Sequence, residues 1–138
     1  MELAFVIAIF IIMVAALTPF VKMTREHASN IACADNLRQI SLGLHMFAVD
    51  NKGAFPQSLR VLYPKYVKDE KAFDCPSSKS IGTPDKPDYE YIAGLTERSP
   101  KETAVVYDPS SNHNSRGSNF VRVGGVVEWV RNGDSKPK

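Results

Sequence analysis

The chain has 138 residues, of which 17 are Lys or Arg and 15 are Asp or Glu, so its formal net charge is only +2. Because the cations are scattered among the anions, this balance excludes an electrostatic nucleic-acid binder. Without the apolar N-terminal run and its helical continuation, about 85 residues remain, enough for one modest core and no second domain.

An uncharged apolar run lies near the start of the chain, from Leu3 to Val21, between Glu2 and Lys22. Its nineteen residues would span about 28 Å as a helix, close to the ~30 Å hydrocarbon core of a bilayer. The run therefore predicts a helix held in a membrane or in a substitute for one. A cleaved secretory signal fits poorly, because the run has no basic segment before it and no small-x-small cleavage site after it. A plain signal anchor stays open.

The helical pattern continues beyond Pro19. Apolar residues recur at spacings of four, three, four and three, at Cys33, Leu37, Ile40, Leu44 and Phe47. This stripe predicts an amphipathic second half with one buried face, and Gly53 and Pro56 provide its stop. We therefore expect one helix over about 3–51, apolar on all sides in residues 1–21. Pro19 indicates either an ordinary kink in a transmembrane helix or a point where the helix can unwind.

The remaining chain is rich in turn signals and short strands. We expect short helices near 57–62 and 69–73, loops over 77–88 and 108–118, and strands at 89–95, 103–107, 120–123 and 126–130. Gly124-Gly125 predicts a two-residue hairpin turn. The expected fold class is α+β, with a small antiparallel sheet packed on the C-terminal half of the long helix, inside one globular domain of residues 22–138.

The start of the chain resembles that of type IV pilins and type II secretion pseudopilins. In that family a glutamate precedes an apolar helix and a proline follows it 17 positions later, which is the separation of Glu2 and Pro19. The match implies that a few mature residues precede Met1.

Motifs farther along resemble one bacterial branch of the same family. They are the helix motif Cys33-Ala34-Asp35-Asn36-Leu37-Arg38-Gln39-Ile40, the turn Phe55-Pro56, the loop Cys75-Pro76-Ser77 and a C-terminal element that begins at His113. The branch continues that element with an Asp-Gly-His hairpin. This chain departs from it, because Gly124 and Val126 occupy the positions of the aspartate and the second histidine.

The resemblance implies a non-enzymatic subunit of an extracellular helical filament, a type IV pilus or pseudopilus of many identical copies. The subunit would wait in the cytoplasmic membrane and require a prepilin peptidase and an inner-membrane assembly machinery, with no need for nucleic acid. The filament core would include Phe5, Ile9, Ile12 and Leu17. Two alternatives stay open: a membrane-anchored binding protein that never polymerises, and a minor pseudopilin of a secretion system.

Glu2 has two interpretations. An acidic residue at a helix N-terminus interacts favourably with the helix dipole even when it is solvated. The resemblance implies instead an assembly salt bridge inside the filament, with an adjacent α-amine as the partner. Because a buried unpaired charge is costly, such a pair could set the register between subunits.

Cys33 on the apolar stripe and Cys75 in a proline-flanked loop predict a disulfide if the domain lies in an oxidising compartment. The bond would close a 41-residue interval and stabilise the fold by about 3–4 kcal/mol in the chain-entropy model. Two buried free thiols are the alternative. A zinc site is disfavoured, because neither cysteine has a His or Cys at ligand spacing in the sequence.

His113 lies in a polar loop with Asp108 but outside any zinc or nucleophile motif. Asp and Asn side chains in such loops typically cap turns. We therefore expect no catalytic residue, no protein-held metal and no resident cofactor, although the oxygen-rich loop Asp108–Asn119 leaves open a weak Ca²⁺ site like that of some pseudopilins. The absence of a Cys-x-x-Cys-His motif excludes covalent haem on this chain.

Overall fold

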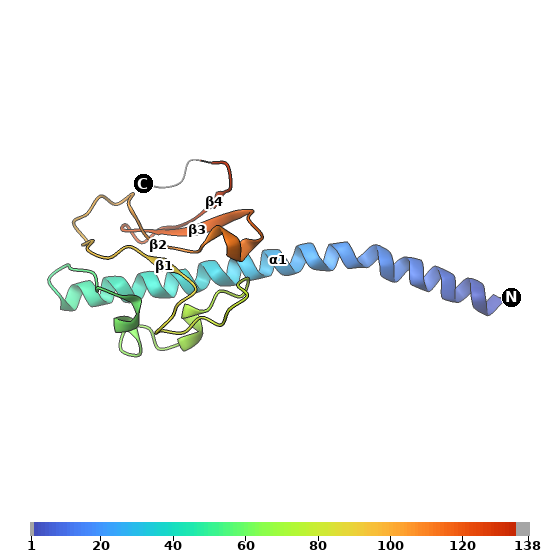
Figure 1. The fold of residues 1–138 in the computed structure, drawn as a ribbon, viewed down its shortest axis with the longest axis horizontal. Helices are drawn as coiled ribbons and strands as arrows, with labels where there is room; N and C mark the ends of the chain where they lie inside the picture. The colour runs from blue at the N-terminus through green and yellow to red at the C-terminus, as the bar shows by residue number, and fades with distance from the viewer. Residues whose placement is uncertain (1, 135–138) are drawn as a thin grey trace.

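A long helix organises the molecule. The computed structural model describes residues 2–134, without the side chains of Glu2, Phe5, Pro19 and Phe20. Helix α1 (Glu2–Asp50) projects its N-terminal half away from the domain, while its C-terminal half lies inside the domain (Figure 1). The predicted helix is confirmed to within a residue at each end, and the α+β fold class is confirmed.

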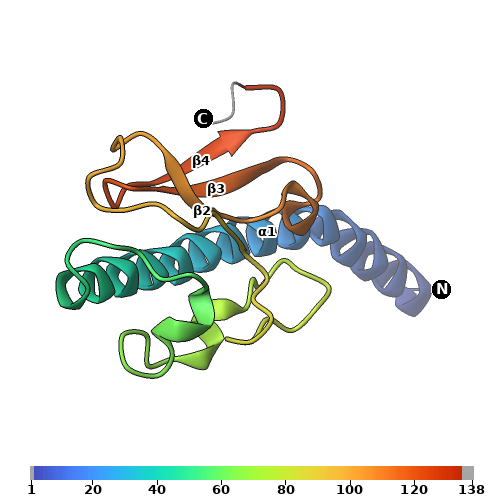
Figure 2. The same cartoon turned by 60° about the vertical axis from the view of Figure 1, so that its left-hand side comes forward.

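A four-stranded antiparallel sheet covers one side of α1. Its strands are β1 (Glu90–Tyr91), β2 (Ala104–Tyr107), β3 (Gly117–Arg122) and β4 (Val127–Arg131), and they lie in the order β1-β2-β3-β4. The other side of α1 is covered by the segment that contains two short 3₁₀ helices, η1 (Leu59–Leu62) and η2 (Glu70–Phe73) (Figure 2). The C-terminal half of α1 is therefore enclosed between two layers.

The predicted apolar stripe is the centre of the core. Cys33, Leu37, Ile40 and Leu44 are all buried, and they pack with residues of η1, η2 and the sheet. Their spacing puts them on one side of α1, so a single helix face supplies one wall of the core. Burial of this face fixes how the domain sits on the helix.

Several predicted boundaries move in the structure. The segments expected as short helices near 57–62 and 69–73 form 3₁₀ turns, and β1 has only two residues where seven were expected. Strand β3 starts at Gly117 instead of 120, because Ser118 and Asn119 pair with Val130 and Trp129 of β4. The expected polar loop also contains a third 3₁₀ helix, η3 (Ser110–His113). Polar residues thus take part in regular structure that an apolar pattern does not reveal.

The predicted hairpin joins β3 to β4 with a turn one residue longer than expected. The Gly125 N–H donates to the Arg122 carbonyl at 2.8 Å, and the Arg122 N–H donates to the Val126 carbonyl at 2.9 Å. Gly125 has a φ of 84°, in the left-handed region that glycine adopts without a Cβ clash. The turn therefore uses the second glycine of the pair for its backbone freedom.

Candidate functional site

The N-terminal half of α1 is an exposed apolar rod. Every described side chain from Leu3 to Thr18 is exposed, including the expected filament-core residues Ile9, Ile12 and Leu17. By length and composition alone, the helix qualifies as a candidate membrane span. No residue of this stretch is charged and Thr18 is its one polar residue, so water is a poor environment for it.

Three predicted assembly residues lie where the structure describes only the backbone. Helix α1 is continuous through Glu2, Phe5 and Pro19, but their side chains are outside the described part of the chain. The salt bridge of Glu2, the core packing of Phe5 and the unwinding at Pro19 remain predictions.

The two cysteines meet inside the domain. Cys33 faces inward from α1, and Cys75 follows η2, two residues beyond its last residue. Both are buried free cysteines, with their sulfur atoms 3.3 Å apart. The structure thus brings together the residues that the predicted disulfide would join, and the disulfide itself remains a prediction.

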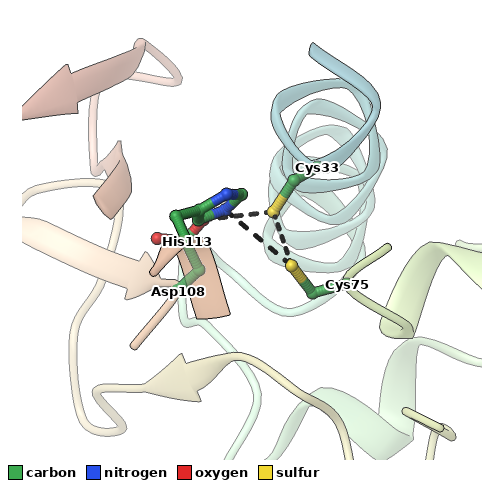
Figure 3. A group of neighbouring side chains, drawn as sticks. All are labelled: Cys33, Cys75, Asp108 and His113. Carbon is green, nitrogen blue, oxygen red and sulfur yellow. Dashed lines mark hydrogen bonds and ion pairs between the residues drawn. The ribbon is translucent and has the colours of Figure 1, made fainter. Parts of the chain in front are cut away.

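Asp108 and His113 complete a four-residue cluster with these cysteines (Figure 3). The Oδ2 atom of Asp108 lies 3.1 Å from Cys33 Sγ and 2.7 Å from His113 Nε2. Cys75 Sγ lies 3.8 Å from the same ring nitrogen. All four side chains are buried, and their potential ligand atoms lie within 4.8 Å of one another. We refer to this set as the Cys-Cys-Asp-His cluster.

The cluster joins three separate parts of the fold. Helix α1 contributes Cys33, the loop after η2 contributes Cys75, and the connection between β2 and β3 contributes Asp108 and His113. Asp108 directly follows β2, and the turn of η3 returns His113 towards it. Neither cysteine has a His or Cys at ligand spacing in the sequence, whereas the fold brings these four side chains together from distant segments. Cys33, Cys75 and His113 belong to the motifs that resemble the pilin family. Those motifs are the sequence signal that could have linked three of the four residues.

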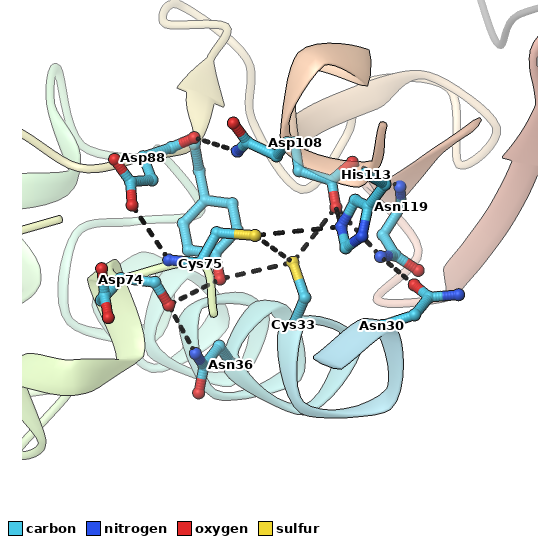
Figure 4. A network of polar contacts seen from close by, with 11 residues as sticks. Asn30, Cys33, Asn36, Asp74, Cys75, Asp88, Asp108, His113 and Asn119 are labelled. Atoms are coloured by element: carbon cyan, nitrogen blue, oxygen red, sulfur yellow. Dashed lines mark hydrogen bonds and ion pairs between the residues drawn. The ribbon is translucent and has the colours of Figure 1, made fainter. Parts of the chain in front are cut away.

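A set of hydrogen bonds fixes the Asp108 carboxylate (Figure 4). The backbone N–H of Asn119 donates to Oδ1 at 2.6 Å, and its side-chain amide donates to Oδ2 at 3.0 Å. The same amide group also donates to Asn30 Oδ1 on α1 at 2.8 Å. Asp108 is fully buried, so these bonds replace the water that its charge would otherwise require. They also explain why polar Asn119 is buried within β3.

The other members of the cluster are held as well. The Cys75 N–H donates to Asp88 Oδ2 at 3.1 Å, and Cys33 Sγ lies 3.5 Å from the hydroxyl of buried Tyr89. The ring of His113 packs edge-on against Trp129 of β4, with ring centroids 5.3 Å apart. The donor atoms therefore belong to side chains with restricted orientations.

Close contact shifts the pKa values of three members of the cluster. The hydrogen bond between the sulfurs, aided by His113, overcomes burial and lowers the pKa of the Cys75 thiol to about 6. That same bond, burial and the Asp108 charge raise the pKa of Cys33. Burial would lower the pKa of His113, but its hydrogen bonds with Asp108 and Cys75 outweigh that effect and raise it to about 9. The protonation of Cys33, Cys75 and His113 is therefore coupled inside one buried cluster.

This arrangement does not match a cysteine nucleophile with a catalytic histidine. In such sites one ring nitrogen faces the nucleophile and the other faces the orienting carboxylate. Here the single atom His113 Nε2 faces both Cys75 Sγ and Asp108 Oδ2. Burial of Cys75 also separates its sulfur from any large substrate. Sulfur, nitrogen and oxygen donors that converge on one point are typical of metal binding instead.

The loop Asp108–Asn119 is the segment for which the sequence leaves a weak Ca²⁺ site open. Asp108 is its only acidic residue, and both carboxylate oxygens are turned towards Asn119, His113 and Cys33. Asn112 and Asn114 use their amide groups to bond to Asp88 O and Glu26 Oε1. The weak Ca²⁺ site remains a prediction, and the side chain that would contribute its charge points into the cluster.

The other two histidines lie outside the cluster. His45 Nδ1 is 3.1 Å from Glu97 Oε1, and its ring packs edge-on against Phe55. His27 is exposed on α1 and lines a surface pocket with Asn30, Trp129 and His113. This pocket brings solvent to the edge of the cluster beside His113.

Comparisons of the chain with protein-family models, with curated proteins and with solved structures find no significant match.

Proposed function

We propose that the chain is a non-enzymatic structural subunit of an extracellular helical filament, which polymerises through the apolar half of α1. One observation carries the proposal: a single helix packs one face against its own domain over one half and is exposed and apolar over the other. Lipid would cover the exposed half before assembly, and the same half of other copies would cover it afterwards.

The lack of a hinge between the two halves favours polymerisation over simple anchoring. Helix α1 runs without a break from Glu2 to Asp50, so the domain is attached directly to the apolar rod. A simple tether could use a flexible linker. An open helical array needs every copy to make the same head-to-tail contact, which a fixed domain orientation favours.

The family resemblance described above supports specific roles within the assembly. Glu2 would pair with an α-amine of a neighbouring copy, while Phe5, Ile9, Ile12 and Leu17 would pack in the filament core. Pro19 would mark the place where α1 can unwind once the dense bundle has formed. The domain of residues 22–138 would coat the outside.

Electron microscopy of material sheared from the cell surface tests the proposal. Regular filaments that contain this chain as the main component are expected. A chain that remains monomeric in the membrane fraction would support the membrane-anchored binding protein instead. Filaments in which this chain is a rare component would support the minor pseudopilin.

A matched pair of substitutions tests the role of the apolar half. Ile12 and Leu42 have similar exposure, 68% and 62%, but lie in the rod and on the domain part of α1, respectively. Ile12→Lys puts a charge into the apolar segment, at a cost of about 2.5–3.5 kcal/mol for insertion at the centre of a bilayer. Ile12→Lys should abolish filaments and Leu42→Lys should leave them intact. Equal yields from both variants would contradict polymerisation through the rod.

A further inference from the structure

We propose that the Cys-Cys-Asp-His cluster is a structural zinc site, with two sulfurs, one carboxylate oxygen and one imidazole nitrogen as its ligand atoms. The cluster lies wholly within the domain, so the proposal does not depend on filament assembly. A zinc site would explain why four polar side chains are buried together, for which the proposed filament function gives no reason.

Four of the six distances between the donor atoms are close to those around a tetrahedral ion, and the other two are within 4.8 Å. Ordinary zinc bond lengths place two sulfurs about 3.8 Å apart, a sulfur and a nitrogen or oxygen about 3.6 Å apart, and a nitrogen and an oxygen about 3.4 Å apart. The corresponding distances are 3.3 Å between the sulfurs, 3.1 Å from Cys33 Sγ to Asp108 Oδ2, and 3.8 Å from Cys75 Sγ to His113 Nε2. The nitrogen–oxygen distance is 2.7 Å. Each differs from the tetrahedral value by about 0.7 Å or less, so small side-chain rotations would admit the ion.

The donor set selects zinc over calcium or magnesium. Thiolate sulfur and imidazole nitrogen prefer zinc and other late transition metals, whereas calcium and magnesium require oxygen ligands. Binding would displace the proton from any thiol that still carries one, and the two sulfurs would coordinate as thiolates. A dication would also balance the anionic sulfur and carboxylate groups that the fold brings together in a buried place.

The surroundings resemble the outer shell of a metal site. Asn119 fixes both carboxylate oxygens of Asp108, and Trp129 restricts the ring of His113. Such outer contacts orient ligands and typically contribute 10–100-fold to metal affinity, as an order-of-magnitude figure. The pocket beside His113 gives an ion a route from solvent. Four protein ligands would leave no open coordination position, which is typical of a structural site and not of a catalytic one.

A disulfide between the two cysteines is the competing state. It would use only Cys33 and Cys75, and it gives no reason for a carboxylate and an imidazole to face the same sulfurs. Zinc uses all four groups and connects helix α1, the loop after η2 and the β2–β3 connection at one point. A disulfide would connect only the first two.

Metal analysis of the full-length chain in detergent tests the proposal. The chain is purified without oxidants, incubated with equimolar Zn²⁺ and desalted, and its zinc content and free thiols are measured. We expect about one tightly held zinc per chain, and removal by a chelator should lower the melting temperature by more than about 10 °C. Substitution by Co²⁺ should give the strong visible bands of a tetrahedral ion and the near-ultraviolet bands of cobalt–thiolate bonds.

Variants locate the ion. Cys75→Ser and His113→Ala should each lose the cobalt–thiolate spectrum of the native site or weaken zinc binding by at least about 100-fold. His27→Ala is the matched control, because His27 is exposed and borders the same pocket without joining the cluster. It should bind zinc like the unaltered chain. The cobalt spectrum of the unaltered chain needs no variant, so it remains informative even if a substitution prevents folding.

Three outcomes would overturn the proposal. The first is a chain with both thiols free that leaves equimolar zinc unbound. The second is a chain that has lost two hydrogens by mass through a disulfide and still binds no zinc once it is reduced. The third is zinc that Cys75→Ser and His113→Ala retain as tightly as His27→Ala does.

Discussion

Asn119 holds Asp108 by two hydrogen bonds, one from its backbone N–H to Oδ1 at 2.6 Å and one from its side-chain amide to Oδ2 at 3.0 Å. The backbone bond survives a substitution such as Asn119→Ala, but the side-chain bond does not. The side chain also reaches Asn30 on α1, so it links the carboxylate to both the sheet and the helix. This residue therefore controls the orientation of Asp108.

Asn119→Ala should weaken zinc binding by roughly 10–100-fold, because Asp108 Oδ2 loses the donor that orients it. A competition titration with a chelator of known affinity measures the effect. Asn132→Ala is the control, since Asn132 is exposed and its side-chain amide donates to the Ser115 carbonyl, away from the cluster. Unchanged zinc affinity in Asn119→Ala would show that the backbone bond alone suffices.

Gly117→Ala should destabilise the domain by about 1–3 kcal/mol, because a Cβ there would lie 2.7 Å from the Trp129 ring and against the Val130 carbonyl. Trp129 is the only tryptophan in the chain, so its fluorescence during urea unfolding reports the change directly. Gly124→Ala is the comparison, because the nearest atoms to its added Cβ are at 3.4 Å. Equal midpoints for the two variants would argue against a tight contact at Gly117.

Tyr91 should make the stability of the domain fall at high pH. Burial raises the pKa of its phenol to about 12, above the ordinary value near 10, and the hydroxyl donates to the Pro56 carbonyl at 2.6 Å. Because the folded state holds the proton more tightly, this contribution is complete below about pH 10 and is lost as the pH rises towards about 12. Urea unfolding between pH 8 and the alkaline limit measures it.

Tyr91→Phe provides the control for that pH dependence. It should cost about 1 kcal/mol at pH 8 through the lost hydrogen bond, and its stability should fall less steeply above pH 10. Parallel curves for the two proteins would show that other groups cause the alkaline loss. Tyr89 and Tyr107 also have raised pKa values, so part of the fall should persist in the variant.

Glu2→Ala should reduce filament yield while the domain remains folded and the chain remains in the membrane fraction. The reason is the loss of the proposed charge pair between neighbouring copies, while every residue from Leu3 to Val21 is kept. Filament yield is counted by electron microscopy and compared with Glu90→Ala, a substitution on the exposed face of β1. Normal yield from Glu2→Ala would contradict the salt-bridge role.

Local periodicity explains why the helix could be predicted from the sequence. Cys33, Leu37, Ile40 and Leu44 follow the helical repeat, and burial of one face then fixes where the domain packs. The start of β3 was harder to predict, because Ser118 and Asn119 are polar and yet buried. The polar groups of Asn119 donate hydrogen bonds to Asp108, a contact that no local sequence pattern indicates.

The Cys-Cys-Asp-His cluster depends on contacts between distant segments. Cys33 and Cys75 could be paired in advance, since they are the two cysteines of the chain. Their meeting with His113 requires η3 to turn the loop back and the sheet to pack over α1. Neither condition can be inferred from spacing, so the meeting of these four side chains could not be predicted from the sequence.

Because α1 is continuous, the angle of the domain about the helix axis is fixed relative to the apolar half. One residue added to a helix advances it by about 1.5 Å and turns it by about 100°. An insertion or deletion directly after Val21, ahead of the contacts that Glu26 and Asn30 make with the domain, would therefore turn the whole domain around the helix axis relative to the apolar half. In the proposed filament, the number of residues between the two halves would determine which face of the domain each neighbouring copy meets, as long as α1 stays helical through Pro19.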